Sequence, residues 1–369
     1  FGDYNMAKII KVDIENFSYG EETILQDIHF SVEKGEFIVI TGLSGCGKTS
    51  LLRLLNGLIP NLYDGEITGE IHILGKSISN YKKGEIAKYV GNVFQNPNDQ
   101  FFSKEVENEI ALIGENMGME RQLLHERVQN ALQEIGITDL KTKNVRELSG
   151  GQKQKVAIAS TLVFDSEIIF FDEPSANLDY KATNDLEKIL KHLKEQGKTI
   201  VIAEHRLSYL SQLLDRLILL KDGKIKMIFS SDNLTDDVEH ENDLRSFNNK
   251  NLRSTMEDPD NHQMINIEDV YVSNNGYSLD EPVNFSLNRG ECMALIGENG
   301  IGKTTLAKEL TGLIPMRNGK TSYAQSTRSR LSNVAISLQN CSNMFFCETV
   351  EKELIPQNKN KDQKYLAEV

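Results

Sequence analysis

The 369-residue sequence has no tryptophan and only 4 cysteines, and it lacks long apolar runs. The cysteines (Cys46, Cys292, Cys341 and Cys347) show no CxxC or Cys/His spacing, so we expect free thiols in a reducing compartment rather than a metal module. The apolar run over residues 51–62 is well short of the ~20 residues that span a bilayer. Residues 1–5 carry no secretion-signal pattern. The sequence therefore predicts a cytoplasmic chain that crosses no membrane by itself.

Positive charge is scarce: 41 Lys and Arg residues face 54 Asp and Glu residues, which gives a formal net charge of -13. An acidic surface repels phosphate backbones, so no nucleic acid is expected as a partner. The 39% of hydrophobic and 26% of charged residues are typical of a globular protein. The length suffices for two domains, or for one domain and part of another.

Two segments resemble each other across a stretch rich in Asp, Glu, Asn and Ser. HFSVEKGEFIVITGLSGCGKTSLLRLLNGLIP in the first half corresponds to NFSLNRGECMALIGENGIGKTTLAKELTGLIP in the second. The match continues through Gln95, which corresponds to Gln339. We expect a first domain over residues 6–229, an acidic linker over 230–262 and the N-terminal part of a second domain over 263–369.

Apolar runs alternate with segments of helical spacing. The runs at residues 37–41, 168–171 and 199–203 predict buried strands, and residues 49–58, 120–135, 151–164 and 180–196 predict helices. Such alternation favours a parallel sheet with right-handed crossovers. Residues 98–164 contain no strong strand candidate, so they are expected to form a helical subdomain inserted into the α/β domain.

Residues 42–49 read GLSGCGKT and fit GxxxxGK[ST] between a predicted strand and a predicted helix. Glycines allow backbone N–H groups to turn toward phosphates at a helix N-terminus. We expect Lys48 to reach the β- and γ-phosphates of ATP and Thr49 to bind Mg²⁺. Residues 297–304, GENGIGKT, repeat the pattern with Lys303 and Thr304. The other expected ATP-binding residues are Gly42, Leu43, Ser44, Gly45, Cys46, Gly47 and Ser50, and Gly297, Glu298, Asn299, Gly300, Ile301, Gly302 and Thr305.

Two acids end an apolar run in the sequence IIFFDE, downstream of the first glycine-rich loop. At the carboxyl end of a strand, Asp172 can help to hold Mg²⁺ while Glu173 polarises the attacking water. Between these motifs stands LSGGQ, formed by Leu148, Ser149, Gly150, Gly151 and Gln152, at the start of a predicted helix. A helix start of this kind is a second anion site.

With LSGGQ beside the other motifs, nearly the whole chain resembles the ABC ATPase family. The resemblance implies a P-loop NTPase fold: a RecA-like parallel sheet, antiparallel N-terminal strands and an inserted helical subdomain that carries the signature. It also implies a head-to-tail dimer in which each ATP lies between one domain's P-loop and the other domain's LSGGQ. By the same resemblance, Gln95 is the Q-loop residue, His205 the switch histidine and Tyr19 the adenine-stacking aromatic. The D-loop is Ser175, Ala176, Asn177, Leu178 and Asp179, and the Mg²⁺ residues are Thr49, Gln95 and Asp172, with Thr304 and Gln339 in the second copy.

The second copy departs from the family pattern. Val272 takes the place of Tyr19, although Tyr271 or Tyr277 could serve through a shifted loop. As written, the sequence also stops before a second LSGGQ, acid pair or switch histidine. We therefore expect the second copy to be incomplete.

FQNPNDQFF, DEPSANLD and AEHRLSYL resemble the energy-coupling-factor importers with two ATPase domains on one chain. That resemblance implies an integral membrane coupling subunit, a separate membrane component that captures a vitamin or metal ion, and a peripheral location on the cytoplasmic face of the membrane. Pro97, Phe101 and Phe102 are expected to line a groove for a helix of the coupling subunit. Two alternatives are a soluble tandem ABC ATPase acting on ribosomes and a nucleotide-binding fragment without turnover. The ribosome-bound class has a long, helical, basic linker, and the short acidic linker here counts against it.

Overall fold

The computed structural model describes residues 8–234, 263–274, 277–278, 281–288, 290–315, 319–321, 335–337, 347 and 349–354. The chain divides into two compact units, Phe1–Arg253 and Ser254–Val369. No helix among these described residues is both long and apolar enough to cross a bilayer. Most of the segment expected to be a linker, residues 235–262, lies outside the described part of the chain.

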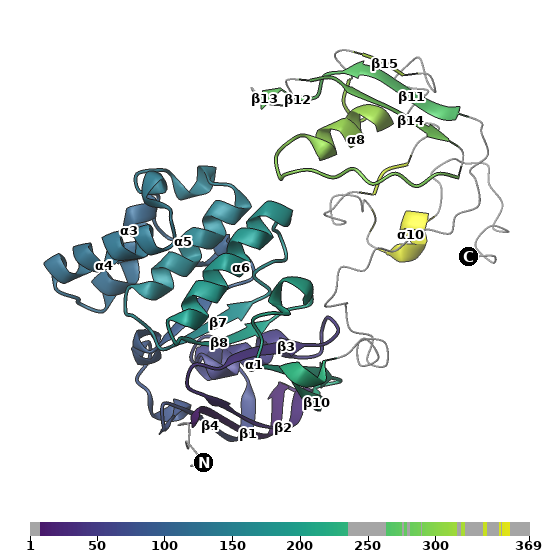
Figure 1. Cartoon of the computed structure of the whole chain (residues 1–369). Coiled ribbons are helices and arrows are strands. Elements are labelled where there is room, and N and C mark those ends of the chain that lie inside the picture. Colours follow the sequence, from purple (N-terminus) through teal and green to yellow (C-terminus); the bar gives the residue numbers. More distant parts are fainter. Residues whose placement is uncertain are drawn as a thin grey trace. The chain divides into compact units, whose positions relative to one another are not determined.

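The first unit is built on two sheets (Figure 1). The 6-stranded sheet has the order β10-β9-β3-β8-β7-β6, in which only β10 is antiparallel to its neighbour. The 4-stranded antiparallel sheet has the order β2-β1-β4-β5. The strands are β1 (Lys8–Tyr19), β2 (Glu22–Glu33), β3 (Phe37–Thr41), β4 (Glu66–Ile73), β5 (Lys76–Ser77), β6 (Val90–Val93), β7 (Ile168–Asp172), β8 (Thr199–Ala203), β9 (Arg216–Lys221) and β10 (Lys224–Ser230).

Both faces of the parallel sheet are covered, so its central strands are apolar throughout. In β3, Phe37 and Val39 face a core cluster formed with the helical layer. Ile38 and Ile40 face the opposite cluster, which contains Leu51 of helix α1 and residues of β1 and β2. Because side chains alternate along a strand, a continuous apolar run serves both cores. Helix α1 thus lies between the parallel and the antiparallel sheet.

The helices of the first unit are α1 (Lys48–Leu55), α2 (Leu58–Asn61), α3 (Val106–Asn116), α4 (Arg121–Glu134), α5 (Gly150–Leu162) and α6 (Tyr180–Glu195). Short 3-10 turns are Ile78–Asn80, Glu85–Lys88, Pro97–Gln100, Thr138–Leu140, Val145–Glu147, Ser208–Leu210 and Ser231–Asn233. The predicted helix over 49–58 ends early, because Gly57 adopts a φ of 72° that breaks it. No strand of the sheets lies in residues 98–164. The predicted fold class, an α/β P-loop fold with antiparallel N-terminal strands and a helical layer, is confirmed.

The second unit contains a 3-stranded antiparallel sheet with the order β14-β11-β15. Its elements are β11 (Gln263–Val270), β12 (Ser273–Asn274), β13 (Tyr277–Ser278), β14 (Val283–Asn288), α8 (Lys303–Thr311), β15 (Lys320–Thr321) and α10 (Val350–Leu354). Residues 292–296, which correspond in sequence to β3, form no strand. Ile296 is 87% exposed there, whereas every residue of β3 is buried. In the first unit β3 lies between β8 and β9, and the described residues of the second unit contain no equivalent of these two strands.

Candidate functional site

The glycine-rich loop of the first unit connects β3 to α1. Two of its glycines are required by conformation and by space. Gly42 has a φ of 147°, and a Cβ there would lie 2.1 Å from the Leu220 carbonyl oxygen. Gly47 has a φ of 101°, and its Cβ would lie 2.6 Å from Leu25 Cδ2. The loop therefore passes close to neighbouring backbone, and its residues direct the chain into the N-terminus of α1.

Lys48 is the first residue of α1 and is only 4% exposed. Its Nζ donates hydrogen bonds of 3.1 Å to the carbonyl oxygens of Gly42 and Leu43. The Cys46 Sγ lies 3.8 Å from the same ammonium. Burial raises the pKa of the Cys46 thiol, while the charge of Lys48 opposes that increase. The loop thus holds one buried cation against its own carbonyl groups.

Thr49 and Asp172 form a pair of oxygen groups next to the loop. The Thr49 hydroxyl donates a hydrogen bond of 3.1 Å to Asp172 Oδ1, at the end of β7. Burial raises the pKa of Asp172 to about 6; the Thr49 hydrogen bond opposes this shift and the Glu173 charge adds to it. A hydroxyl and a carboxylate are ligands that Mg²⁺ accepts in phosphate sites. The two residues therefore fit the predicted metal role.

Three side chains that we predicted to be catalytic meet at the carboxyl edge of the parallel sheet. Gln95 Nε2 donates a hydrogen bond of 2.9 Å to Glu173 Oε2. His205 Nε2 lies 3.0 Å from Glu173 Oε1, and these two side chains are only 22% and 20% exposed. The three residues follow β6, β7 and β8, which are neighbours in the sheet. Parallel strands end at one edge, and this brings residues far apart in sequence to one carboxylate.

Glu173 has an unusual backbone conformation, with a φ of 43°. Its N–H donates a hydrogen bond of 2.8 Å to the carbonyl oxygen of Ala203 in the neighbouring strand. A left-handed residue other than glycine costs on the order of 1–3 kcal/mol, and the surrounding structure must compensate. The strand end is thus locally strained at the residue that holds Gln95 and His205.

Tyr19 lies at the end of β1, where its hydroxyl donates to Ser50 Oγ over 3.4 Å. Its half-buried ring packs edge-on against Phe17, with ring centroids 4.9 Å apart. The hydrogen bond joins the predicted adenine-stacking residue to helix α1. The ring therefore lies close to the glycine-rich loop.

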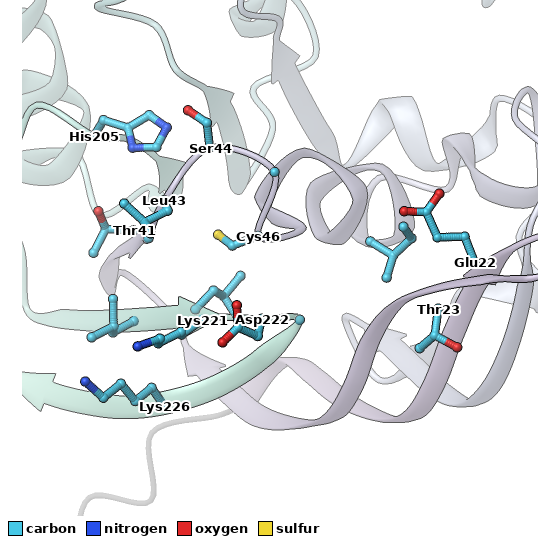
Figure 2. A pocket seen from close by; sticks show the side chains of 16 residues that line it. Glu22, Thr23, Thr41, Leu43, Ser44, Cys46, His205, Lys221, Asp222 and Lys226 are labelled. Carbon is cyan, nitrogen blue, oxygen red and sulfur yellow. The ribbon is translucent and has the colours of Figure 1, made fainter. Parts of the chain in front are cut away.

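A pocket of about 620 Å³ lies along the glycine-rich loop. Figure 2 shows His205 and Ser44 on the same side of this pocket, with Lys221, Asp222 and Lys226 across from them beyond Cys46. The last three belong to the hairpin of β9 and β10 and were not among the predicted site residues. An Asp-Gly pair between apolar runs is a known hairpin signal, and Asp222-Gly223 would have indicated this turn.

The signature segment forms the N-terminus of α5. Ser149 accepts a hydrogen bond of 3.3 Å from Gln152 N, and Gln152 Oε1 accepts one of 3.0 Å from Ser149 N, which completes a capping box. A Cβ at Gly151 would lie 2.8 Å from Ala182 Cβ on α6, whereas Gly150 has no such close neighbour. The pocket at the glycine-rich loop includes no residue of 148–152. Within the described first unit, the signature therefore does not line the pocket at the glycine-rich loop.

The expected D-loop, residues 175–179, connects the strand end at Glu173 to α6. Ser175 is fully buried. Asp179 caps α6 by accepting a hydrogen bond of 2.9 Å from Ala182 N, while Ala176 and Asn177 are exposed and Leu178 is half-buried.

The groove expected beside Gln95 is present, but not with all of the predicted residues. Phe102 is 81% exposed and lines a pocket of about 380 Å³, together with Leu62 and Tyr63. Phe101 instead packs against the core of the helical layer, and Pro97 is buried. The prediction that Pro97 and Phe101 line this groove is therefore wrong, because of these three residues only Phe102 is exposed.

The second glycine-rich loop repeats the geometry of the first. Lys303 Nζ donates hydrogen bonds of 2.7 Å to the carbonyl oxygens of Gly297 and Glu298, and Gly302 precedes α8 with a φ of 106°. Thr304 is exposed, and Gln339 lies outside the described residues. Val272 is buried, and its Cγ1 lies 2.7 Å from where a Gly302 Cβ would be. Tyr271 is 41% exposed, and the side chain of Tyr277 is not among those described.

Comparison with known proteins gives consistent matches. The family model for ABC transporters matches residues 25–176 and 281–369. A putative ABC transporter ATP-binding protein of Treponema denticola is 38% identical over 364 residues, covering 93% of this chain and 73% of that protein. A protein of the same description from Methanosarcina mazei is 32% identical over 93% of this chain and 71% of its own length.

Solved structures resemble part of this chain in fold. The structure of cbiO1 from Clostridium perfringens, described as part of the ABC transporter complex cbiONQ, is 31% identical with a TM-score of 0.55, over 61% of this chain and 89% of that one. A dimeric ATP-binding cassette in a post-hydrolysis state, bound to ADP and Pi, is 27% identical with a TM-score of 0.52, over 60% of this chain and 98% of that one.

Proposed function

The chain belongs to the ABC transporter family of ATP-binding proteins, and we propose that it binds and hydrolyses ATP at the carboxyl edge of the first unit's parallel sheet. The observation that carries this proposal is the contact of Glu173 with both Gln95 and His205, beside the Thr49–Asp172 pair. Strand-end carboxylates next to a glycine-rich loop are the arrangement that phosphoryl transfer needs.

Each residue has a definite part in this mechanism. The loop's N–H groups and the N-terminus of α1 bind the phosphates, and Lys48 exchanges its two loop carbonyls for β- and γ-phosphate oxygens. Thr49, Asp172 and Gln95 would hold Mg²⁺, which would supply positive charge beside the phosphates. Glu173 orients the attacking water and accepts its proton. His205 binds the γ-phosphate, and Tyr19 stacks on adenine.

We further propose that the signature acts in trans. Its serine caps α5 and does not line the pocket along the glycine-rich loop, so a second ATPase unit in head-to-tail arrangement would bring Ser149 to a bound triphosphate. The similarity to a dimeric cassette bound to ADP and Pi supports this arrangement. The exposed start of α5 adds a helix N-terminus that stabilises the γ-phosphate.

The transport role we propose is that of an importer of the energy-coupling-factor class, which takes up a vitamin or a metal ion. Similarity to cbiO1 supports this class. The groove with Leu62, Tyr63 and Phe102 is apolar enough to accept a helix of an integral membrane coupling subunit, and it adjoins Gln95. Such a subunit would hold the chain at the cytoplasmic face of the membrane, while a separate membrane component captures the substrate.

The test is to identify the partners of the tagged chain after mild detergent extraction of membranes from its native cells. We expect an integral membrane protein without nucleotide motifs to co-purify in constant ratio. The Phe102→Ser variant serves as control, because it removes the exposed ring of the groove and should lose that partner. Co-purification with ribosomes, or no change on Phe102→Ser, would contradict the importer assignment.

A further inference from the structure

A buried carboxylate next to the switch histidine has no role in the mechanism above. Glu204 is only 2% exposed and follows the last residue of β8. Its Oε1 accepts hydrogen bonds from the backbone N–H groups of His205, over 2.8 Å, and Arg206, over 3.1 Å. Because both donors belong to the turn that carries His205, the carboxylate fixes the backbone of that histidine.

The second oxygen of Glu204 reaches a different segment. Oε2 accepts hydrogen bonds from Ser175 N, over 3.3 Å, and from the Tyr209 hydroxyl, over 2.8 Å. Ser175 is the first residue of the D-loop and is fully buried. Burial and the charge of Glu204 raise the pKa of Tyr209 well above its ordinary value, so its hydroxyl remains a donor. One carboxylate thus joins two loops that start from neighbouring strands.

Arg206 makes a second connection between the same loops. Its Nη1 donates to the carbonyl oxygens of Ser175, over 3.2 Å, and Leu178, over 3.4 Å. The D-loop therefore receives a hydrogen bond at each end of this stretch from the turn that holds His205. A displacement of either loop would break bonds to a buried charge, which costs more than breaking bonds at the surface.

We propose that Glu204 is a positioning residue for ATP hydrolysis, which holds His205 against Glu173 and couples that contact to the D-loop. The inference rests on the proposed role of Glu173 and His205. A shift of the D-loop is therefore transmitted to His205 through Glu204. Hydrolysis then responds to the position of the D-loop without any contact between Glu204 and ATP.

The experiment compares Glu204→Gln with Tyr209→Phe in the full chain, with kcat calculated per ATP-binding site. An amide has only one acceptor oxygen, so the NH₂ group introduced by Glu204→Gln must face either the Ser175 N–H or the N–H groups of His205 and Arg206. Two donors then face each other, because backbone N–H groups cannot reorient. We expect Glu204→Gln to lower kcat about tenfold while KM for ATP stays within about twofold, because the P-loop is untouched. Tyr209→Phe is equally buried but leaves all three backbone bonds to Glu204, so its kcat should stay within about twofold.

Arg206→Gln and Glu173→Gln complete the comparison. Arg206→Gln removes only the two side-chain hydrogen bonds from Arg206 to the D-loop and should lower kcat about threefold at unchanged KM, which provides a test if Glu204→Gln fails to fold. Glu173→Gln tests the proposed site separately: if it retains turnover, the proposed function is wrong. If Glu173→Gln is inactive while Glu204→Gln and Arg206→Gln keep the wild-type kcat, or Tyr209→Phe loses as much as Glu204→Gln, the inference about Glu204 is wrong.

Discussion

Gln95 and Glu173 are separated by 78 positions in sequence, yet the Gln95 side-chain amide donates a hydrogen bond of 2.9 Å to the Glu173 carboxylate. Gln95 also adjoins the groove that contains Phe102. One residue therefore connects the proposed membrane-subunit surface with the proposed catalytic base. A helix that moves in the groove would act on Glu173 through a single side chain.

The raised pKa of Asp172 predicts how the nucleotide-free protein responds to pH. The folded value, about 6, exceeds the ordinary 3.8, so the folded state binds the proton more tightly than the unfolded state does. The energetic cost of ionising Asp172 is therefore absent below about pH 4, grows between about pH 4 and 6, and is complete above that. Asp172→Asn removes the charge but keeps an acceptor for Thr49. At about pH 7.5 we expect this variant to have a free energy of unfolding up to about 3 kcal/mol above that of wild type, and therefore a higher unfolding temperature.

Differential scanning calorimetry without nucleotide measures this difference, and it should fall to about half at about pH 5. Thr49→Val, which removes the hydroxyl donor but leaves the carboxylate, is the matched control and should not gain stability. A difference between wild type and Asp172→Asn that is independent of pH would contradict the buried-charge explanation.

Phe102 and its neighbour Phe101 provide a matched pair for the groove. Phe102→Ser removes an exposed ring, so we expect unchanged thermal stability, ATP turnover of the isolated chain within about twofold of wild type, and loss of the membrane partner. Phe101→Ser removes a ring that packs on the helical core and should cost about 1–3 kcal/mol of stability. Equal destabilisation by both substitutions, measured by thermal unfolding, would place Phe102 in the core as well.

Pairing of ATPase units predicts that two inactive variants restore activity when mixed. One variant carries Lys48→Ala, and the other carries Gly150→Asp, which puts a negative charge next to the γ-phosphate at the signature. Gly150 is preferred to Gly151 because a side chain at Gly151 would clash with Ala182. Both chains also carry Lys303→Ala, so that the second glycine-rich loop does not contribute.

Each variant alone should be nearly inactive, and an equimolar mixture should recover about one quarter of the activity of Lys303→Ala alone. About half of randomly assembled pairs contain one chain of each variant. In such a pair one of the two sites has both an unchanged Lys48 and an unchanged Gly150, so the mixture has about one quarter of the sites intact. Activity should also rise with protein concentration. A mixture as inactive as its components would show that the signature does not act across chains.

The sequence predicted the central strands and the main helices because their apolar patterns have a clear period. Residues 37–41 form a continuous apolar run, which is what a strand buried on both faces requires, and β3 has these bounds. The glycine-rich loop was also predicted, from its GxxxxGK[ST] spacing. The structure shows that Gly42 and Gly47 occupy positions where no side chain fits. These features depend on local sequence and could therefore be recognised.

Features that depend on tertiary packing could not be predicted in this way. Nothing in FQNPNDQFF distinguishes the exposed Phe102 from the packed Phe101, because the turn before α3 decides which ring faces outward. Glu204 stands next to His205 in sequence and accepts three hydrogen bonds from residues 205–209, but its fourth comes from Ser175 N in the D-loop, which follows another strand. The apolar run at residues 292–296 resembles β3 but forms no strand, because a strand also needs partners.

The measurement that tests the account most directly is ATP turnover by Glu173→Gln, compared with ATP binding by the same protein. Gln is nearly isosteric and keeps one oxygen for the Gln95 amide, but it cannot accept a proton from water. We predict that ATP affinity in the presence of Mg²⁺ stays within about threefold of wild type while kcat falls at least about a hundredfold. Lys48→Ala, in contrast, should weaken binding itself. Turnover near the wild-type rate in Glu173→Gln would contradict the assignment of Glu173 as the catalytic base and, with it, the proposed site.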